Sequence, residues 1–400
     1  MYRKPSPSPV LAPNITASSV NIQRGLHVSK FYYFFFFGAI GSIVPFFNVY
    51  LEQIGLTGTQ IGWIGSVPPL IALTSNPLWG AIGDRWQIHR QLLAGLALAS
   101  GLLSLLFLSV QTFWPIMLVV VGLSFFRTPI PALVDSTVMS LVKQGGSSYG
   151  RQRMWGSLGF VLTTYGLAQL VNLEDLRLIF WIHAGLLAVG CAILSLQLPI
   201  QGSLERVNIL TGLRTLVARP GYVHYLAGMV LLGVGAAGFA SFLGLHILAL
   251  GGTESQVGLA WALNAITEVP IMFMGARWFG GIRNSRLMLI GFLGMSLVWA
   301  GLGMAQTPVQ LLMVAPFTGF CYGLFWVAAV GYAAESAPKG LEATAQSLGG
   351  AAQAGLGWGV GSILAGALWD VANGHVILFT SAGVVLAAAV IFWAGNRRAL

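Results

Sequence analysis

Four ionisable side chains lie within or beside long apolar stretches of this chain: Arg127, Asp135, Arg153 and Glu268. Such groups are costly inside a membrane, so they usually face a cavity or a partner. Burial disfavours the charged form of a carboxyl, so Glu268 could take up a proton from one side and release it to the other as its hydration changes. We expect Glu268 to couple proton or substrate binding, with a structural hydrogen bond to a neighbouring helix as the alternative.

The other three charges suggest related roles. The guanidinium of Arg127 could hold an anionic substrate through two parallel hydrogen bonds, because its geometry suits a carboxylate. It could instead pair permanently with Glu268 or Asp135. Asp135 and Arg153 could meet if the chain turns back at Gly145–Gly146. We expect that pair to be mainly structural or gating, and direct proton transfer through Asp135 is the alternative.

Several aromatic and polar residues could line a cavity between helices. Helical phase alone does not separate cavity positions from positions that face lipid. The candidates for the cavity lining are Tyr50, Asn264, Tyr322, Trp326 and Gln353.

Motifs for enzymatic or metal chemistry are missing from the sequence. It contains no HExxH motif, no Gly-rich loop ending in GK[ST] and no nucleophile elbow with partners. The two cysteines, Cys191 and Cys321, lie in apolar runs without metal or disulfide spacing. We therefore expect no enzyme activity, no cofactor and no metal. Without a nucleotide site, a proton or ion gradient is the natural energy source.

The composition is that of a membrane protein. Of the 400 residues, 56% are hydrophobic and only 8% are charged, and the mean hydropathy is +0.79, which excludes a soluble domain. Twelve apolar stretches are long enough to cross about 30 Å of hydrocarbon. They cover residues 28–50, 59–82, 91–110, 114–140, 152–171, 177–198, 222–249, 256–277, 287–305, 309–334, 345–369 and 376–395.

The positions of the basic residues predict the orientation. Of the 20 Lys and Arg residues, Arg177 alone falls in a loop on one side and Arg127 lies within a stretch. All the others lie on the opposite side. Basic loops stay in the cytoplasm, so both termini are expected to be cytoplasmic. The net charge of +9 is then explained by basic residues on the cytoplasmic side of the membrane, and we expect no nucleic-acid partner.

One strip of sequence occurs twice. Residues 54–62, IGLTGTQIG, recur as residues 250–258, LGGTESQVG, with every position shifted by 196. The repeat predicts two similar halves in one orientation, packed around a central site. The expected organisation is a disordered cytoplasmic tail at 1–26, an N-terminal six-helix bundle at 27–198, a cytoplasmic connector at 199–220 and a C-terminal six-helix bundle at 221–400.

The loop after the second stretch carries a recognisable motif. Its residues Gly80, Gly83, Asp84, Arg85 and Arg90 resemble the loop 2–3 signature of the major facilitator superfamily. The resemblance implies that the acidic residue latches onto the start of the eleventh helix, near 343–347, and favours one state of the cycle. The alternative is a charged, tight turn between spans. In the second half Gly280–Gly281 replaces the charged pair, so the latch would be one-sided.

A narrower resemblance covers much of the chain. Residues 149–157, YGRQRMWGS, resemble the YGxxRxWGS signature of phenylpropionate-permease-like facilitators. Residues 31–34, 45–46, 54–57, 257–261 and 268–269 are similar to other parts of that group. Residues 343–346, ATAQ, resemble the start of the eleventh span in nucleoside and oligosaccharide proton symporters. Those relatives use a glutamate of the eighth span in substrate binding, which implies a similar role for Glu268.

These observations together predict an all-α membrane protein with twelve transmembrane helices in two pseudo-symmetric bundles. We expect a monomeric secondary transporter in the cell membrane. It would move a small organic solute of the aromatic acid, sugar or nucleoside class by alternating access, with proton symport. Two alternatives remain: a proton-coupled exporter, and a non-transporting membrane sensor on the same fold. Buried charges at Arg127 and Glu268 argue against the sensor.

Overall fold

The computed structural model describes residues 15–145, 147–171, 175–199, 215–219, 221–338 and 341–397. The regular elements within these residues are helices. Helix α1 begins at Ile15, so residues 15–26 are helical here, although the sequence analysis placed them in the tail. Residues 1–14 of that tail lie outside the described residues, as do residues 200–214 and 220 of the expected connector.

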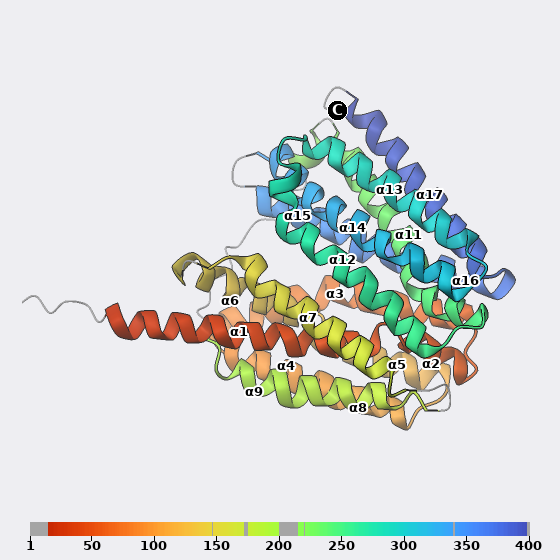
Figure 1. Ribbon diagram of the computed structural model, residues 1–400. Helices are drawn as coiled ribbons and strands as arrows, with labels where there is room; N and C mark the ends of the chain where they lie inside the picture. Colours follow the sequence, from red (N-terminus) through yellow and green to blue (C-terminus); the bar gives the residue numbers. More distant parts are fainter. Residues whose placement is uncertain are drawn as a thin grey trace, which may run out of the picture.

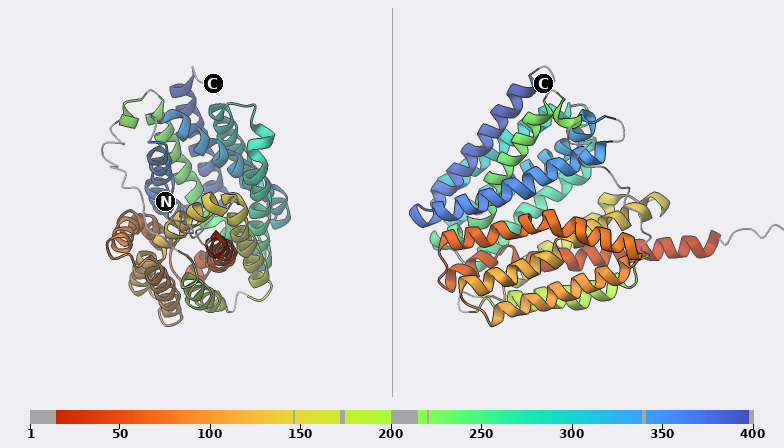
Figure 2. Two further views of the ribbon diagram at one scale, coloured as in Figure 1. Left: turned by 90° about the vertical axis from the view of Figure 1, so that its left-hand side faces the viewer. Right: turned by 180° about the vertical axis from the view of Figure 1, so that it is seen from behind.

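The first half of the chain forms one bundle of helices, and the second half forms another (Figures 1 and 2). The elements of the first bundle are α1 (Ile15–Ile43), α2 (Phe47–Gln53), α3 (Gly58–Trp86), α4 (His89–Ser104), η1 (Leu105–Leu108), α5 (Phe113–Arg127), α6 (Pro129–Gly145), α7 (Tyr149–Ala168), α8 (Leu178–Ala184), η2 (Gly185–Cys191) and α9 (Ala192–Ser195). Those of the second are α11 (Tyr222–Ala249), α12 (Glu254–Phe279), α13 (Asn284–Met304), α14 (Pro308–Ser336), α15 (Glu342–Gly350), η3 (Ala351–Gly357), α16 (Trp358–Val371) and α17 (Gly374–Asn396).

Ten helical segments of the described chain are long and apolar enough to cross a membrane. Two of the expected stretches are interrupted by proline, which lacks a backbone donor and clashes with the preceding turn. Pro45 separates α1 from α2, and Pro129 separates α5 from α6. Other prolines, such as Pro270 in α12, stay inside continuous helices. Regular helix is therefore interrupted near these two prolines, and Arg127 is the last residue before one of the interruptions.

The repeated strip folds in the same way in both halves. Gly55 and Gly251 have φ angles of +88° and +83°, a left-handed conformation that suits glycine. Two residues later Thr57 and Thr253 cap the following helices, α3 and α12, and each forms a capping box with the glutamine three residues on. The sequence repeat is thus a structural repeat of one turn and one helix start.

The two bundles are joined by hydrogen bonds at one end, which we call the closed end. It comprises residues 45–59, 169, 241–255 and 366–370. Asp370 of α16 accepts from the backbone N–H groups of Gly58 and Thr59 at the start of α3, at 2.6 and 2.8 Å. Gln169 Nε2 donates to Ser255 Oγ at 2.8 Å. Both copies of the repeated strip therefore contact the opposite bundle.

Glycines let the helices of the two bundles approach one another next to the closed end. A Cβ atom on Gly62 of α3 would meet the backbone of Ser362 and Gly366 in α16. A Cβ atom on Gly258 of α12 would meet Ala168 of α7. Away from this end the bundles diverge toward α6 and α15 (Figure 1).

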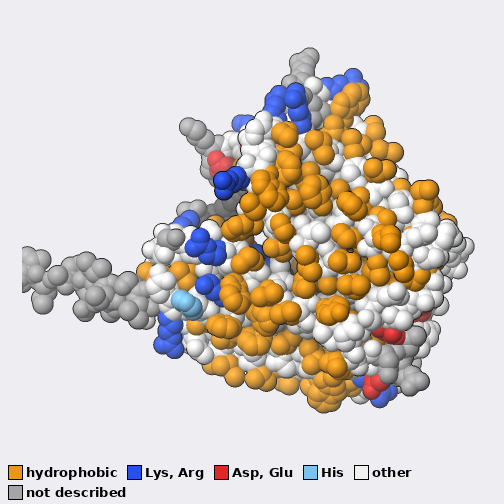
Figure 3. All heavy atoms as spheres, in the orientation of Figure 1, with side chains coloured by type: hydrophobic (Ala, Val, Ile, Leu, Met, Phe, Trp, Pro, Cys, Tyr) orange, Lys and Arg blue, Asp and Glu red, His pale blue; other side chains and the backbone are white. Residues whose placement is uncertain are grey.

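The surface agrees with a membrane environment. Hydrophobic side chains cover much of the face shown in Figure 3. Lys and Arg side chains gather on that face near the beginning of α1 and near the C-terminus, at the ends of the bundles opposite the closed end (Figure 3).

Candidate functional site

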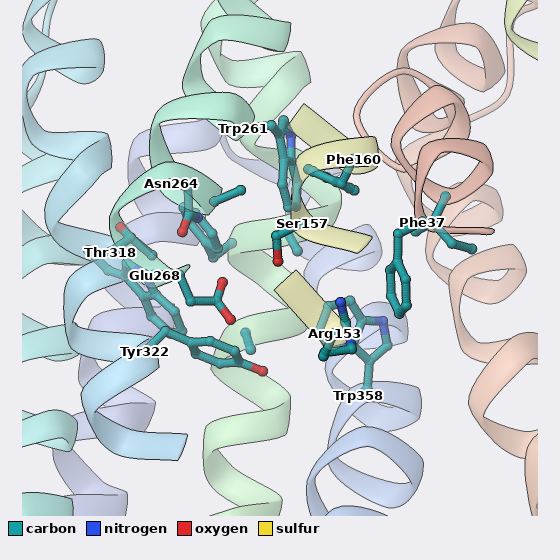
Figure 4. A pocket seen from close by; sticks show the side chains of 16 residues that line it. Phe37, Arg153, Ser157, Phe160, Trp261, Asn264, Glu268, Thr318, Tyr322 and Trp358 are labelled. Carbon is teal, nitrogen blue, oxygen red and sulfur yellow. The ribbon is translucent and has the colours of Figure 1, made fainter. Parts of the chain in front are cut away.

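A cavity of about 280 Å³, which we call the central cavity, lies between the two bundles. Four of its lining residues are polar or charged side chains on two facing helices, α7 and α12, and Figure 4 shows them together. The lining is Phe37, Ile40, Arg153, Ser157, Phe160, Ala236, Phe239, Ala240, Trp261, Asn264, Ala265, Glu268, Trp299, Thr318, Tyr322 and Trp358.

Helical periodicity explains why these side chains share a cavity. Positions three or four apart lie on the same face of a helix. On α12 this brings Trp261, Asn264 and Glu268 to one face. On α7 the same spacing aligns Arg153 and Ser157. The central cavity thus receives one stripe from each of two helices that belong to different bundles.

Glu268 is directed into the central cavity and toward Arg153 (Figure 4). Its carboxylate is near enough to Arg153 for the two charges to interact, and near enough to affect Tyr322. The structure shows no ion pair within 4.0 Å for Glu268 among the residues it describes. The carboxylate therefore faces a cationic group across the cavity and remains open to a ligand or a proton.

Arg153 is held by aromatic rings. The guanidinium carbon lies 3.5 Å from the centroid of the Phe37 ring and 5.9 Å from that of Tyr33, which stabilises the cation through the electron-rich ring faces. The Tyr33 hydroxyl in turn donates to Asp135 Oδ1 at 2.5 Å. Arg153 and Asp135 belong to one cluster, in which Tyr33 lies between them.

The sequence predicted a direct pair between Asp135 and Arg153, without a role for Tyr33 or Phe37. The structure places the two charges near each other, but within the described residues it shows no ion pair between them. The signal for Tyr33 was its position in the aromatic run 31–37. That run surrounds the helix on all sides, so its periodicity could not show which ring faces the charges.

Arg127 lies in a second cavity, of about 140 Å³, which we call the outer cavity. Its walls include Asn48, Ser124 and Arg127 itself. The two cavities share Ala240 and Trp358 as lining residues. Arg127 and Glu268 therefore line separate cavities, and of the two arginines it is Arg153 that shares a cavity with Glu268.

The loop motif lies at the ends of the bundles opposite the closed end. Asp84 Oδ1 is 3.4 Å from Nε2 of His89, and Gly83 packs beneath the His89 ring. Arg85 and Arg90 are exposed, and Gly80 is buried in α3. Among the described residues, Asp84 thus faces His89 of its own bundle, and no ion pair joins it to α15 in this conformation.

The residues predicted to line a cavity lie in three different places. Asn264 and Tyr322 line the central cavity. Gln353 lies behind Tyr322 and donates to its hydroxyl at 3.4 Å, and the Trp326 ring lies 6.1 Å from the Tyr322 ring. Tyr50 is buried within the first bundle, where its hydroxyl donates to the carbonyl of Phe107 at 3.0 Å.

In the part of the chain that the structure describes, no cluster of three or more His, Cys, Asp or Glu side chains could hold a metal ion.

Comparison with known proteins shows which family this chain matches. The family model described as "MFS_1 like family" matches residues 26–380. The maltose permease of Geobacillus stearothermophilus is 30% identical over 380 residues, which cover 92% of this chain and 94% of that protein. The probable 3-phenylpropionic acid transporter of Escherichia coli (strain K12) is 29% identical over 295 residues, which cover 70% and 75% of the two chains.

Solved structures share the fold. A mutant of the nucleoside transporter NupG has a TM-score of 0.83 at 18% identity, over 92% of this chain and 99% of that one. A bacterial homologue of the human lysosomal transporter Spinster, in an inward-facing and occupied conformation, has a TM-score of 0.76 at 14% identity, over 93% and 96% of the two chains.

Proposed function

The chain belongs to the MFS_1 like family of secondary transporters, and from this premise we propose that it takes up its solute by proton symport. As a member of this family it is a transporter of small organic solutes and not an enzyme. The proposed solute belongs to the aromatic acid, sugar or nucleoside class and binds in the central cavity. The observation that carries the proposal is Glu268, a carboxylate between the bundles that faces Arg153 and has no ion-pair partner among the described residues.

The central cavity has the chemistry that such a solute needs. Trp261 and Trp358 offer flat apolar faces on which a sugar, base or phenyl ring can pack. Asn264 and Ser157 offer hydrogen bonds to hydroxyl or carbonyl groups. Ligand sites of this kind are mostly apolar, with a few polar groups that fix the orientation of the ligand.

We propose twelve membrane spans with both termini in the cytoplasm of a monomer in the cell membrane. Ten spans meet the criterion of length and hydropathy. The other two are α3, which contains Pro68, Pro69 and Pro77, and α7, which carries Arg151 and Arg153. Both run the length of their bundle beside spans that meet the criterion (Figure 2). The proposed bundles are residues 27–198 and 221–400, and the distribution of Lys and Arg supports the orientation.

This orientation places the closed end on the outer side of the membrane. The central cavity would then receive the solute from outside only after the contacts of the closed end separate. In the conformation described here the solute would leave toward the cytoplasm. We propose that protonation of Glu268 and solute binding together favour the movement of the bundles, and that Asp84 exchanges His89 for the start of α15 when the cytoplasmic ends meet.

Transport by purified protein in liposomes tests the proposal. A panel of labelled aromatic acids, sugars and nucleosides should contain a solute that accumulates under an imposed pH gradient, acidic outside, and stops accumulating when the gradient is collapsed. The Glu268→Gln protein should lose accumulation but retain exchange of solute across the membrane, because a neutral side chain cannot carry a proton. Accumulation without a pH gradient would refute proton symport.

The matched control is Glu335→Gln. Glu335 is an exposed carboxylate at the end of α14, where it accepts from Asn284 at 2.7 Å. This substitution removes the same charge outside the cavity and should leave accumulation unchanged. Equal activity of both variants would remove Glu268 from the coupling mechanism.

A further inference from the structure

The two arginines that line the cavities, Arg153 and Arg127, differ in the number of carboxylates near them. Asp135 and Glu268 both lie near enough to Arg153 to interact with its charge. Arg127 has neither an ion pair nor a hydrogen bond among the described residues. Its ionisable neighbour His183 feels the charge of Arg127 but cannot supply a negative one. One arginine thus has two carboxylates near it, and the other has none.

A cation without a partner is unfavourable in a membrane interior, where ionisable groups usually pair or face an aqueous path. Arg127 faces the outer cavity, which is large enough for a small polar group. It stands at the last residue of α5, beside the break made by Pro129. The position is therefore a cationic site with space beside it.

Two hydroxyl groups next to Arg127 also lack partners. Ser124 precedes it by one turn, lines the same cavity and is 1% exposed, and its Oγ makes no hydrogen bond. The buried Oγ1 of Thr128 makes none either. Buried polar groups are normally satisfied, and an unsatisfied group that lines a cavity is a position where a water molecule or an ion can bind. Thr128 does not line the outer cavity, but Ser124 and Arg127 both do, so one anion there would satisfy the guanidinium and the Ser124 hydroxyl.

We infer that the outer cavity is the subsite for the carboxylate of the transported solute, with Arg127 as its main ligand and Ser124 beside it. The inference rests on the proposed function and narrows the solute to an organic acid. A guanidinium binds a carboxylate through two parallel hydrogen bonds. Ala240 and Trp358 line both cavities, so the two cavities adjoin. We place the body of the solute in the central cavity, with its acid group directed toward Arg127.

This assignment links solute binding to proton binding through the charge between the bundles. Without solute, Arg127 and Arg153 balance Asp135 and Glu268. A proton on Glu268 leaves one uncompensated positive charge, and a monocarboxylate at Arg127 cancels it. The empty and the loaded transporter are then both neutral in the interior, whereas the transporter with only one of the two ligands carries a charge that opposes movement through the membrane.

Thermal unfolding of the purified protein tests the subsite without knowledge of the natural solute. The probes are benzoate, phenylacetate and 3-phenylpropionate, each compared with its primary amide and with sodium chloride. At least one acid should raise the Tm of the wild-type protein, because a ligand that binds the folded state stabilises it. Its amide and chloride should not.

The variant Arg127→Gln should bind that acid about tenfold to a hundredfold more weakly, as expected for the loss of hydrogen bonds to a charged group. Arg127→Lys keeps the charge without the two parallel donors. Its affinity for the acid should lie between those of wild type and Arg127→Gln. The control Arg177→Gln removes an exposed arginine from a loop and should bind like wild type. Without ligand, Arg127→Gln should unfold at the same temperature as wild type or higher, because it removes an unpaired charge.

Three results would overturn the inference: acids that stabilise no more than their amides, stabilisation by chloride alone, or unchanged acid binding by Arg127→Gln. Chloride stabilisation would assign the subsite to an inorganic anion. Glu268→Gln separates this test from that of the proposed function, because it should still bind the acid while losing accumulation. If Glu268→Gln accumulated solute normally, proton symport would fail while the carboxylate subsite could stand.

Discussion

At the scale of single residues, the charges between the bundles are held by aromatic partners. Arg153 lies against Phe37, and Asp135 accepts from Tyr33. Rings on one helix thereby fix two charges that come from two others, α6 and α7. This arrangement leaves Glu268 free of a direct ion pair among the described residues, as the proposed proton coupling requires.

The Tyr33 hydroxyl should be important for stability. Tyr33→Phe removes the donor to Asp135 and leaves that carboxylate without this hydrogen bond. Because hydrogen bonds to charged groups contribute about 1.5–3 kcal/mol, the variant should unfold at a lower temperature in detergent. The control Tyr165→Phe, on an exposed ring of α7 (47% exposed), should not. A Tyr33→Phe protein as stable as wild type would show that Asp135 does not depend on this bond.

At the scale of elements, the repeated turn requires glycine because of its backbone conformation and not because of close contacts. A Cβ atom at Gly251 would meet nothing within 4 Å, so alanine fits there sterically. Its φ of +83°, however, is one that residues with a Cβ rarely adopt. The turn places Thr253 to cap α12, and α12 carries Glu268. The glycine therefore positions the helix that carries the candidate site.

Gly251→Ala should cost about 1–2 kcal/mol of stability, because an L-residue with a Cβ is strained in a left-handed conformation. Gly281→Ala is the matched control, since it also has open space around it but no positive φ. Thermal unfolding of the two variants measures the difference. Equal stability would mean that the turn relaxes to a different backbone conformation.

At the scale of the whole molecule, hydrogen bonds join the two bundles at the closed end. Asp370 joins the bundles by placing a carboxylate at the positive N-terminal end of α3. The Thr59 hydroxyl donates to the same carboxylate at 2.6 Å, and Trp369 Nε1 donates to Glu52 at 3.2 Å. These contacts must break for the two bundles to separate at this end.

Asp370→Asn should weaken the closed end by about 1–3 kcal/mol, because it removes the charge at the helix start and one acceptor oxygen. Spin labels at Gln53 and Ala372, on opposite bundles, would report a larger population of long distances. Asp175→Asn is the control, because Asp175 also lies in a loop and accepts from Arg177 within its own bundle. Distances unchanged by Asp370→Asn would show that this carboxylate does not hold the bundles together.

Much of the architecture was predictable because a membrane imposes it. Long apolar stretches have to become helices, since backbone groups in lipid must be satisfied within the helix. The repeat of residues 54–62 at 250–258 predicted two matching halves, and the identical turns and caps confirm that these strips are equivalent. Glu268 could be singled out because a carboxylate is rare and costly in such a stretch.

Sequence alone thus determined the helices, the halves and the unusual charges, while only the tertiary structure decided which charges meet. Arg153, and not Arg127, shares the central cavity with Glu268, and Tyr33 lies between Arg153 and Asp135. The physical reason is that lipid-facing and core-facing positions of a membrane helix are both apolar, so periodicity does not reveal rotation about the helix axis. That rotation is set by packing against neighbouring helices, which come from distant parts of the chain.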